Sequence, residues 1–335
     1  MTDPLWTERY APSVGELPQD RLRETLARVR EEPVNFILHG PGGAGKTAAV
    51  RALAAEVHED VENDLTVINV ADFFGRTKKQ IRNDPRFAAF LTGRSRLSKR
   101  DMINHVLKES AAYAPVSGSF KTVLLDNAES IREDFQQALR RVMERYAQNT
   151  QFVITTRQPS KLIPPIESRC LSIPVRAPTA EEIADRLAWI LEREPVAAEP
   201  AGLEYIATAA EGDLRRAILS AQTTANQAET ITSDTVFETL GDVGYDDTVR
   251  EMFEAAEAGE FVTARKSLDT LLTGEGLDGP EVLRKLLATA RECHEGDERA
   301  LVALYERAGE IDLRLQEGVS ARTQLARLLT TMPDG

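Results

Sequence analysis

The fold of this chain is decided by the stretch Gly40-Pro41-Gly42-Gly43-Ala44-Gly45-Lys46-Thr47. It follows the apolar run Phe36-Ile37-Leu38 and precedes an alanine-rich segment, Ala48–Glu56, so a strand, a glycine loop and a helix come in succession. Glycines let backbone N–H groups close around phosphate oxygens at the positive end of a helix. We therefore expect this loop to bind ATP, with Lys46 holding the β and γ phosphates and Thr47 ligating Mg²⁺.

Around this loop, short apolar and β-branched runs alternate with amphipathic stretches. Strands that alternate with helices are joined by crossover connections and form a parallel sheet with helices on both faces. The sequence therefore predicts an α/β domain over residues 1–176, with a less regular insertion rich in Arg and Lys at about 75–101. The predicted strands lie within Val34–Leu38, Leu65–Val70, Thr122–Leu125, Phe152–Thr155 and Leu171–Val175.

After residue 176 the pattern changes to helix alone. A capping box, Thr179-Ala180-Glu181-Glu182, opens the first of these helices. From residue 233 onward apolar residues recur at helical spacing. We expect a small helical lid over residues 177–230 and an all-helical oligomerisation collar over residues 231–335. Individual helices are predicted over residues 180–193, 201–210, 212–228 and 321–329.

Composition excludes several classes of protein. The chain has 335 residues, of which 42% are hydrophobic and 28% charged, and it contains no apolar run near the roughly 20 residues of a membrane span. Its start lacks the basic and apolar order of a signal peptide. We expect a cytoplasmic protein without a membrane partner. Cys170, Cys293 and the four histidines have no metal-ligand spacing, so neither a disulfide nor a zinc site is predicted.

The charge of the chain leaves two interpretations open. The net charge of −13, from 54 acidic and 41 basic residues, argues against a nucleic-acid partner held by phosphate contacts. An acidic, lysine-poor composition is equally typical of proteins from a salt-rich cytoplasm, where net charge serves solubility. Because basic residues also cluster locally, net charge does not exclude DNA binding.

A nucleotide site of this kind needs a carboxylate at the end of a second buried strand, where it holds the water shell of the metal. Asp126, in this Walker B position, ends the run from Lys121 and supplies the carboxylate. The next residue is Asn127, whose amide cannot accept a proton from attacking water, and loss of a general base typically costs about 10² to 10⁴ in rate. Glu129 is a weaker candidate because it lies past the strand end. Binding is supported better than turnover.

Further segments resemble one known family. Leu125-Asp126-Asn127-Ala128-Glu129 leads into Gln137–Glu144, and Ser160–Cys170 ends in Ser-Arg-Cys. This series resembles the small subunit of replication factor C, the AAA+ clamp loader of archaea and eukaryotes, in a paralogue with an altered Walker B motif. The opening Leu5–Pro12 resembles the amino-terminal box of the family, and Gly212–Arg216 resembles its lid motif. The resemblance covers nearly the whole chain, weakly in the insertion and the last hundred residues.

The resemblance implies roles for individual residues. Arg169 matches the arginine that reaches the γ-phosphate in a neighbouring subunit, where a guanidinium contributes strongly to phosphoryl transfer. Arg215 matches the lid arginine that senses nucleotide in its own subunit, and Tyr10 and Pro12 belong to the box that lies against the adenine. Arg157 replaces the Asn that senses γ-phosphate. All departures, including Asn127 and Ala in the Tyr-Ala-Pro box, affect the chain's own site, whereas Arg169 is intact.

The resemblance also implies partners: the large subunit and a small-subunit paralogue of the loader, the sliding clamp and primer-template DNA. Lys99, Arg100 and Lys108, on the helix after the second strand, are the predicted contacts to DNA phosphates. Two alternatives stay open. One is a structural or regulatory subunit that binds ATP without turnover and donates Arg169; the other is a different AAA+ DNA machine, such as a branch-migration motor or an initiator.

Overall fold

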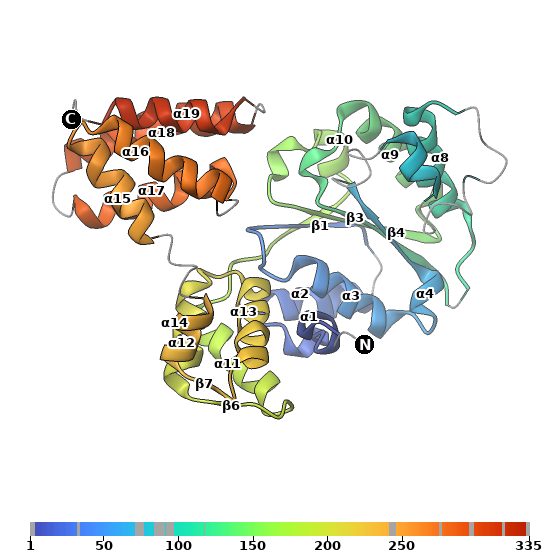
Figure 1. Ribbon diagram of the computed structural model, residues 1–335. Helices are drawn as coiled ribbons and strands as arrows, with labels where there is room; N and C mark the ends of the chain where they lie inside the picture. Colours follow the sequence, from blue (N-terminus) through green and yellow to red (C-terminus); the bar gives the residue numbers. More distant parts are fainter. Residues whose placement is uncertain are drawn as a thin grey trace. The chain divides into compact units, whose positions relative to one another are not determined.

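The computed structural model describes residues 4–31, 34–70, 77–83, 91, 97–116, 118–240, 246–274, 277–294, 298–316 and 319–332. The chain divides into two compact units, Met1–Val236 and Phe237–Gly335. The domain boundaries predicted from the sequence, after residues 176 and 230, stay predictions. Figure 1 shows both units, with elements labelled where there is room.

The first unit is built on a five-stranded sheet in the order β2-β3-β4-β1-β5. Every neighbouring pair of strands runs parallel, so the connections are crossovers, as the alternation of strands and helices predicted. Each of the five predicted runs overlaps one strand, with ends that differ by at most two residues, and the predicted α/β class is confirmed. The strands are β1 (Phe36–His39), β2 (Leu65–Asn69), β3 (Lys121–Asp126), β4 (Thr150–Thr156) and β5 (Leu171–Pro174).

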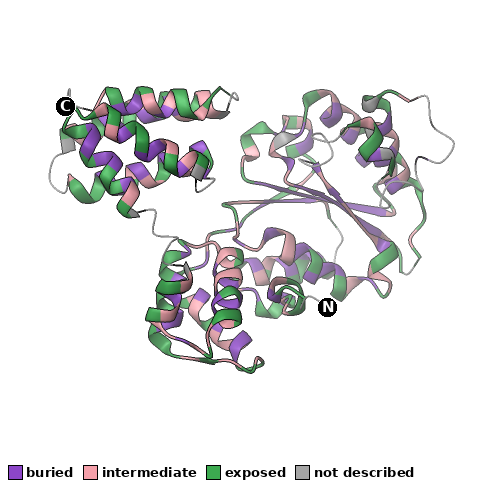
Figure 2. Cartoon of the chain, in the orientation of Figure 1, coloured by how far each residue is buried: buried purple, intermediate pink, exposed green. Residues whose placement is uncertain are grey.

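Helices cover both faces of this sheet because successive strand residues point to opposite sides. In β1, Phe36 and Leu38 lie in one buried apolar cluster and Ile37 lies in another. Helices α2 and α3 complete the first cluster, and α8 and α9 complete the second (Figure 1). The three central strands β3, β4 and β1 are accordingly almost wholly buried, whereas the edge strands β2 and β5 are partly exposed (Figure 2). The four helices are α2 (Asp20–Glu31), α3 (Lys46–Val57), α8 (Lys99–Ala112) and α9 (Glu133–Tyr146).

Short elements connect these layers. Of the predicted insertion at about 75–101, the structure describes residues 77–83, 91 and 97–101, which include α6 and the first turn of α8. The rest of the predicted insertion lies outside the described residues. The short elements are η1 (Val14–Glu16), α4 (Val61–Asp64), α6 (Lys78–Asn83), η2 (Ala128–Ser130), η3 (Pro159–Lys161) and α10 (Pro164–Glu167).

A helical bundle completes the first unit. Helix α11 begins at the predicted capping box: Thr179 Oγ1 accepts the Glu182 N–H at 3.2 Å, and Glu182 Oε2 accepts the Thr179 N–H at 2.8 Å. The N-terminal α1 joins the bundle, since the Trp6 N–H donates to Gln222 Oε1 at 2.9 Å. The paired strands β6 and β7 were not predicted, because two residues show no readable period. The elements are α1 (Trp6–Arg9), α11 (Ala180–Leu191), β6 (Ala197–Ala198), α12 (Pro200–Ala209), α13 (Leu214–Gln227), β7 (Thr230–Ile231) and the first residues of α14 (Ser233–Leu240), which includes the boundary at Val236.

In its described part the second unit is all-helical, as the apolar spacing predicted. Its helices pack around one buried apolar cluster that includes Phe253, Leu268 and Leu286. No helix in the described ranges of either unit is long and apolar enough to cross a membrane. The elements are α15 (Asp246–Glu257), α16 (Phe261–Asp269), the π-helical turn η5 (Thr270–Gly274), α17 (Gly279–Cys293), α18 (Glu298–Gln316) and α19 (Ala321–Thr330).

Candidate nucleotide-binding site

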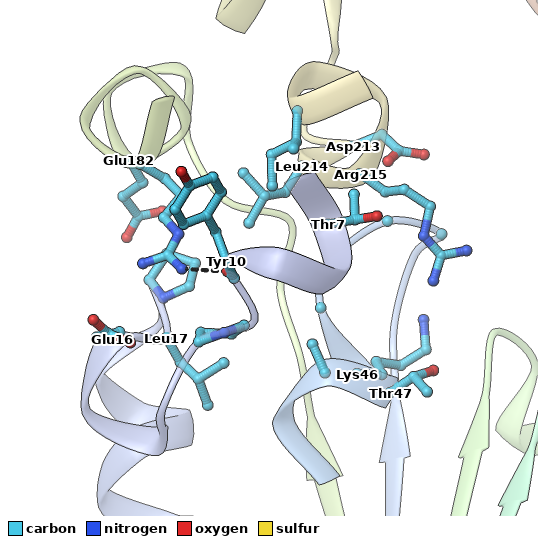
Figure 3. A pocket seen from close by; sticks show the side chains of 18 of the residues that line it. Thr7, Tyr10, Glu16, Leu17, Lys46, Thr47, Glu182, Asp213, Leu214 and Arg215 are labelled. Carbon is cyan, nitrogen blue, oxygen red and sulfur yellow. Dashed lines mark hydrogen bonds between the residues drawn. The ribbon is translucent and has the colours of Figure 1, made fainter. Parts of the chain in front are cut away.

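A pocket of about 810 Å³ lies in the first unit, between the glycine loop and the helical bundle (Figure 3). Its volume is in the range of small-molecule and cofactor sites. Its walls come from the N-terminal segment, the glycine loop, the ends of β3 and β4, and helices α11 and α13. Of the residues predicted for the site, Tyr10, Pro12, Gly42, Gly43, Gly45, Lys46, Thr47, Asn127, Arg157 and Arg215 line the pocket.

The glycine loop needs glycine for two separate reasons. Gly43 and Gly45 have φ angles of 66° and 89°, in the left-handed region that glycine adopts without strain. Gly43 also lies against the bundle: a Cβ placed there would be 1.9 Å from Asp213 Oδ1. Helix α3 begins at Lys46, within the loop motif, so its unpaired backbone N–H groups lie at the pocket wall. This geometry is suited to an anion.

Lys46 lies at the base of the loop. Its Nζ donates to the carbonyl oxygens of Gly40 and Pro41, at 2.8 and 2.5 Å. Burial lowers the pKa of Lys46, and the Glu129 carboxylate partly offsets that effect. Ala44 is buried, and its carbonyl accepts from a glutamine of the N-terminal segment. Gly40, Pro41 and Ala44 thus shape the loop, while Lys46 faces the pocket.

Asp126 is the last residue of β3, and its side chain contacts Thr47. Thr47 Oγ1 donates to Asp126 Oδ1 at 2.7 Å, and Thr155 Oγ1 donates to the same oxygen at 2.5 Å. The hydroxyl and the carboxylate therefore lie side by side next to the glycine loop, and hard oxygen donors of this kind are the ligands that Mg²⁺ prefers. The two residues fit a metal held through one hydroxyl and through water, and the metal site predicted from the sequence stays a prediction.

Asn127 has a left-handed backbone, with φ 56° and ψ 52°. Asn adopts this conformation several times more readily than residues with longer side chains. Its N–H donates to Thr155 Oγ1 at 3.1 Å, and η2 begins with the next residue. The structure thus adds a backbone reason for an Asn where the sequence indicated only a missing carboxylate.

Glu129 and Arg157 form an ion pair at the same end of the pocket. Glu129 Oε1 accepts from Arg157 Nε at 2.8 Å, and Glu129 Oε2 accepts the Arg157 backbone N–H at 3.3 Å. Burial alone would raise the pKa of Glu129, but hydrogen bonds from backbone N–H groups and from Arg157 outweigh it and hold the pKa below its usual range. Both carboxylate oxygens are engaged. The sequence singled out both residues but did not predict their pairing.

The structure distinguishes two adjacent arginines at the start of α13. Arg215 lines the pocket and extends toward Lys46 in Figure 3. Arg216 is not among the described residues that line the pocket, and its N–H donates to Asp213 Oδ1 at 2.9 Å, so that Asp213 caps the helix. The register assigned from the sequence, with Arg215 as the lid arginine, is the one that places a guanidinium in the pocket.

The other end of the pocket contains residues that sequence reasoning missed. Arg186 Nη2 donates to the carbonyl of Tyr10 at 2.7 Å, and the Arg186 guanidinium lies 4.1 Å from the centre of the Trp189 ring. Burial and the Glu194 carboxylate, which accepts from Tyr10 Oη at 2.5 Å, raise the pKa of Tyr10. Four of the missed residues lie on α11 at a spacing of three or four residues, which places them on one face of the helix. This spacing is visible in the sequence. The missed residues include Glu16, Leu17, Glu182, Asp185, Arg186 and Trp189.

Two groups of predicted residues lie outside the pocket. Arg169 follows α10 on the surface, where its Nη2 donates to Glu144 Oε1 at 2.6 Å. On α8, Arg100 Nε lies 3.2 Å from Asp134 Oδ2, so part of its charge is compensated, whereas Lys108 is exposed. The side chain of Lys99 is outside the described residues. The DNA contacts stay predictions.

Known proteins match the chain over nearly its whole length. The family model described as replication factor C C-terminal domain matches residues 245–331, and that described as DNA polymerase III, delta subunit, matches residues 20–179. The replication factor C small subunit of Methanocella arvoryzae is 32% identical over 98% of this chain and 95% of its own. That of Staphylothermus marinus is 32% identical over 98% and 94%. The chain belongs to the replication factor C small-subunit family.

Solved structures extend the likeness of this small subunit to the AAA+ fold. A point mutant of Thermotoga maritima RuvB has a TM-score of 0.54 and 19% identity, covering 83% of this chain and 90% of its own. The Aeropyrum pernix Orc1 protein, solved in complex with DNA, has a TM-score of 0.53 and 18% identity, covering 93% and 85%. At these identities the likeness shows the fold alone.

Proposed function

We propose that this chain is an ATP-binding small subunit of a sliding-clamp loader that hydrolyses little ATP itself and donates Arg169 to a neighbouring subunit. One observation carries the proposal. Asn127 occupies the position of the general base, and the next carboxylate, Glu129, has both oxygens hydrogen-bonded to Arg157.

Several features of the pocket support ATP binding. Lys46, the N-terminus of α3 and the guanidinium of Arg215 bring positive charge to one end of the pocket. Thr47 and Asp126 supply oxygen ligands for Mg²⁺ beside it. When bound, the metal would neutralise charge on the β and γ phosphates. Tyr10, fixed by Arg186 and Glu194, would contact the base at the far end.

Weak hydrolysis follows from the same residues. The attacking water must lose a proton, and an amide such as Asn127 does not accept it. Glu129 is a poor substitute, because its lowered pKa makes it a weaker base and Arg157 engages both of its oxygens. Arg157 also places a permanent positive charge near the γ-phosphate, which favours retention of ATP.

The family supplies the proposed partners. The relatives are named replication factor C small subunits, so we place this chain with the large subunit and a small-subunit paralogue, acting on the sliding clamp and primer-template DNA in the cytoplasm. Lys99, Arg100 and Lys108 would contact DNA phosphates. Nucleotide would change subunit geometry through α13, which carries both Arg215 and the Asp213 contact to Gly43. A branch-migration motor or initiator is less well supported, because RuvB and Orc1 share only the fold.

Single-turnover hydrolysis by the isolated chain tests the proposal. Asn127→Glu restores a carboxylate, and Asn127→Gln has the same length and the same backbone strain without a base, so the pair isolates the proton acceptor. All three proteins are expected to bind ATP, and Asn127→Glu is expected to hydrolyse it about 10²-fold faster than wild type or Asn127→Gln. A wild-type chain that turns over as fast as Asn127→Glu would contradict the proposal.

A further inference from the structure

The backbone at Arg169 is fixed on both sides. Ile166 of α10 is completely buried, and Cys170 packs against the same apolar cluster. The Arg169 N–H donates to the Ile166 carbonyl at 3.0 Å, and the Cys170 N–H donates to the Glu167 carbonyl at 3.2 Å. Burial raises the pKa of Cys170 to about 12, so the thiol stays neutral and serves packing. Because the backbone is fixed, the position of the Arg169 guanidinium depends on the side-chain torsion angles alone.

Three contacts from the same chain hold that side chain. Arg169 Nη2 donates to Glu144 Oε1 at 2.6 Å, and Nη1 donates to the Pro165 carbonyl at 2.7 Å and to Ser168 Oγ at 3.3 Å. A guanidinium has five N–H donors, so these three contacts leave two of them, on Nε and Nη2, for another acceptor. Donors on these adjacent nitrogens match the spacing of two phosphate oxygens.

Glu144 is shared between two arginines. Arg140, one turn earlier on α9, has its Nε 3.8 Å from Glu144 Oε1, and this Nε is buried without a hydrogen-bond partner in the described part of the chain. One carboxylate therefore lies between two guanidinium groups, and these three side chains together carry a net positive charge. Such a cluster attracts an anion even though Glu144 is present.

We infer that Glu144 is a positioning residue for Arg169, and that it holds the guanidinium ready for the γ-phosphate of ATP in a neighbouring subunit. The inference rests on the proposed function, because it requires Arg169 to act across a subunit boundary. An unanchored arginine samples many rotamers and must be ordered on binding, whereas an anchored one is already in place. An exposed ion pair contributes little to fold stability, so the value of this contact is orientation.

DNA-stimulated hydrolysis by the assembled loader tests this role. The part that Arg169→Ala removes defines the finger-dependent hydrolysis. Glu144→Ala is expected to remove about nine-tenths of that part while changing the KM for ATP by less than about twofold. Glu144→Gln keeps an acceptor oxygen for Arg169 Nη2 and is expected to retain about half of the finger-dependent hydrolysis. Glu133→Ala is the matched control, because Glu133 is exposed at the start of α9, the helix that carries Glu144. This variant is expected to retain all of the finger-dependent hydrolysis.

Double variants separate this inference from the proposed function. In the Arg169→Ala background, Glu144→Ala is expected to have no further effect, because its effect passes through the finger. A loader in which Glu144→Ala retains or increases the finger-dependent hydrolysis, or lowers hydrolysis equally in both backgrounds, overturns the inference alone. Arg169→Ala without any effect overturns the proposed function and this inference with it. Glu144→Ala is expected to shift the melting temperature of the isolated chain by no more than about 4 °C.

Discussion

The pocket of this chain and the surface around Arg169 differ in what they keep of a catalytic site. The pocket keeps the groups that we propose to bind a nucleotide, Lys46 and the Thr47–Asp126 pair, but has Asn127 at the position proposed for the proton acceptor. At the surface, Arg169 is present and held in place by Glu144. Where a catalytic site is shared between two subunits, the half that binds and the half that is donated can change separately. We infer that this chain has kept the donated half.

Arg169→Ala should have the largest effect, and only at the donated half. Loss of an arginine finger typically costs about 10³-fold or more in rate, so hydrolysis at the neighbouring site of the assembled loader should nearly vanish. ATP affinity of the isolated chain should stay within about twofold, because Arg169 lies outside the pocket. Calorimetry on the isolated chain and steady-state hydrolysis by the loader check both halves. A weaker ATP affinity of the isolated Arg169→Ala chain would show that Arg169 also serves the chain's own pocket, and would contradict the separation of the two halves.

Lys46→Ala should affect the binding half. Loss of a charge-assisted contact to phosphate corresponds to an affinity about 10- to 100-fold weaker. Lys161→Ala, an exposed change outside the pocket, is the control for loss of one positive charge and should leave ATP affinity unchanged. Equal losses in the two variants would show that the glycine loop is not the phosphate site.

Glu129→Gln should have a smaller effect with the opposite sign. Without the carboxylate, Arg157 loses its ion-pair partner, and its charge attracts a triphosphate more strongly. ATP affinity should rise by roughly three- to tenfold, and ADP affinity should rise less. Titrations of Glu129→Gln and of Arg157→Ala with both nucleotides test this, since Arg157→Ala should lower the preference for ATP. An unchanged ATP to ADP ratio in both variants would remove Arg157 from the γ-phosphate end.

Lys121→Met should change stability alone, at the edge of the sheet opposite to Asp126. Burial lowers the pKa of Lys121 to about 8. The unfolded chain keeps this proton up to about pH 10.4, so between these values the unfolded state binds more protons, and the stability contribution of Lys121 rises with pH. The melting temperature of the wild type minus that of Lys121→Met should therefore be larger at pH 10 than at pH 7, by about 4 °C at most. A change in ATP affinity at pH 7 would contradict this separation.

The sequence predicted the five strands of the main sheet, the helical segments after it, and many of the residues that line the pocket. The strands could be recognised because buried parallel strands have continuous apolar runs, and Gly40–Thr47 because its glycines precede a helix. The position of Asn127, directly after Asp126, predicts that a general base is missing there. These signals are local, so the single chain sequence contains them.

Pairings between distant segments could not be predicted in the same way. Glu129 and Arg157 meet because β3 and β4 are neighbours in the sheet, and Glu144 meets Arg169 because α9 and α10 pack together. The two residues of the first pair are 28 positions apart in the sequence and those of the second pair 25, which is beyond any helical or strand period. The hydrogen bond from the Asn127 N–H to Thr155 Oγ1 likewise joins residues 28 positions apart.

The most direct test compares two loaders, one with Arg169→Ala and one with Asp126→Asn in this chain. Both variants are assembled at saturating ATP, checked for complete assembly by size-exclusion chromatography, and assayed for DNA-stimulated hydrolysis. If this chain hydrolyses little and donates its arginine, Arg169→Ala lowers the total by the share of one active site, whereas Asp126→Asn, which removes metal-binding charge from the chain's own pocket, lowers it much less. A loss with Asp126→Asn as large as that with Arg169→Ala would contradict the account.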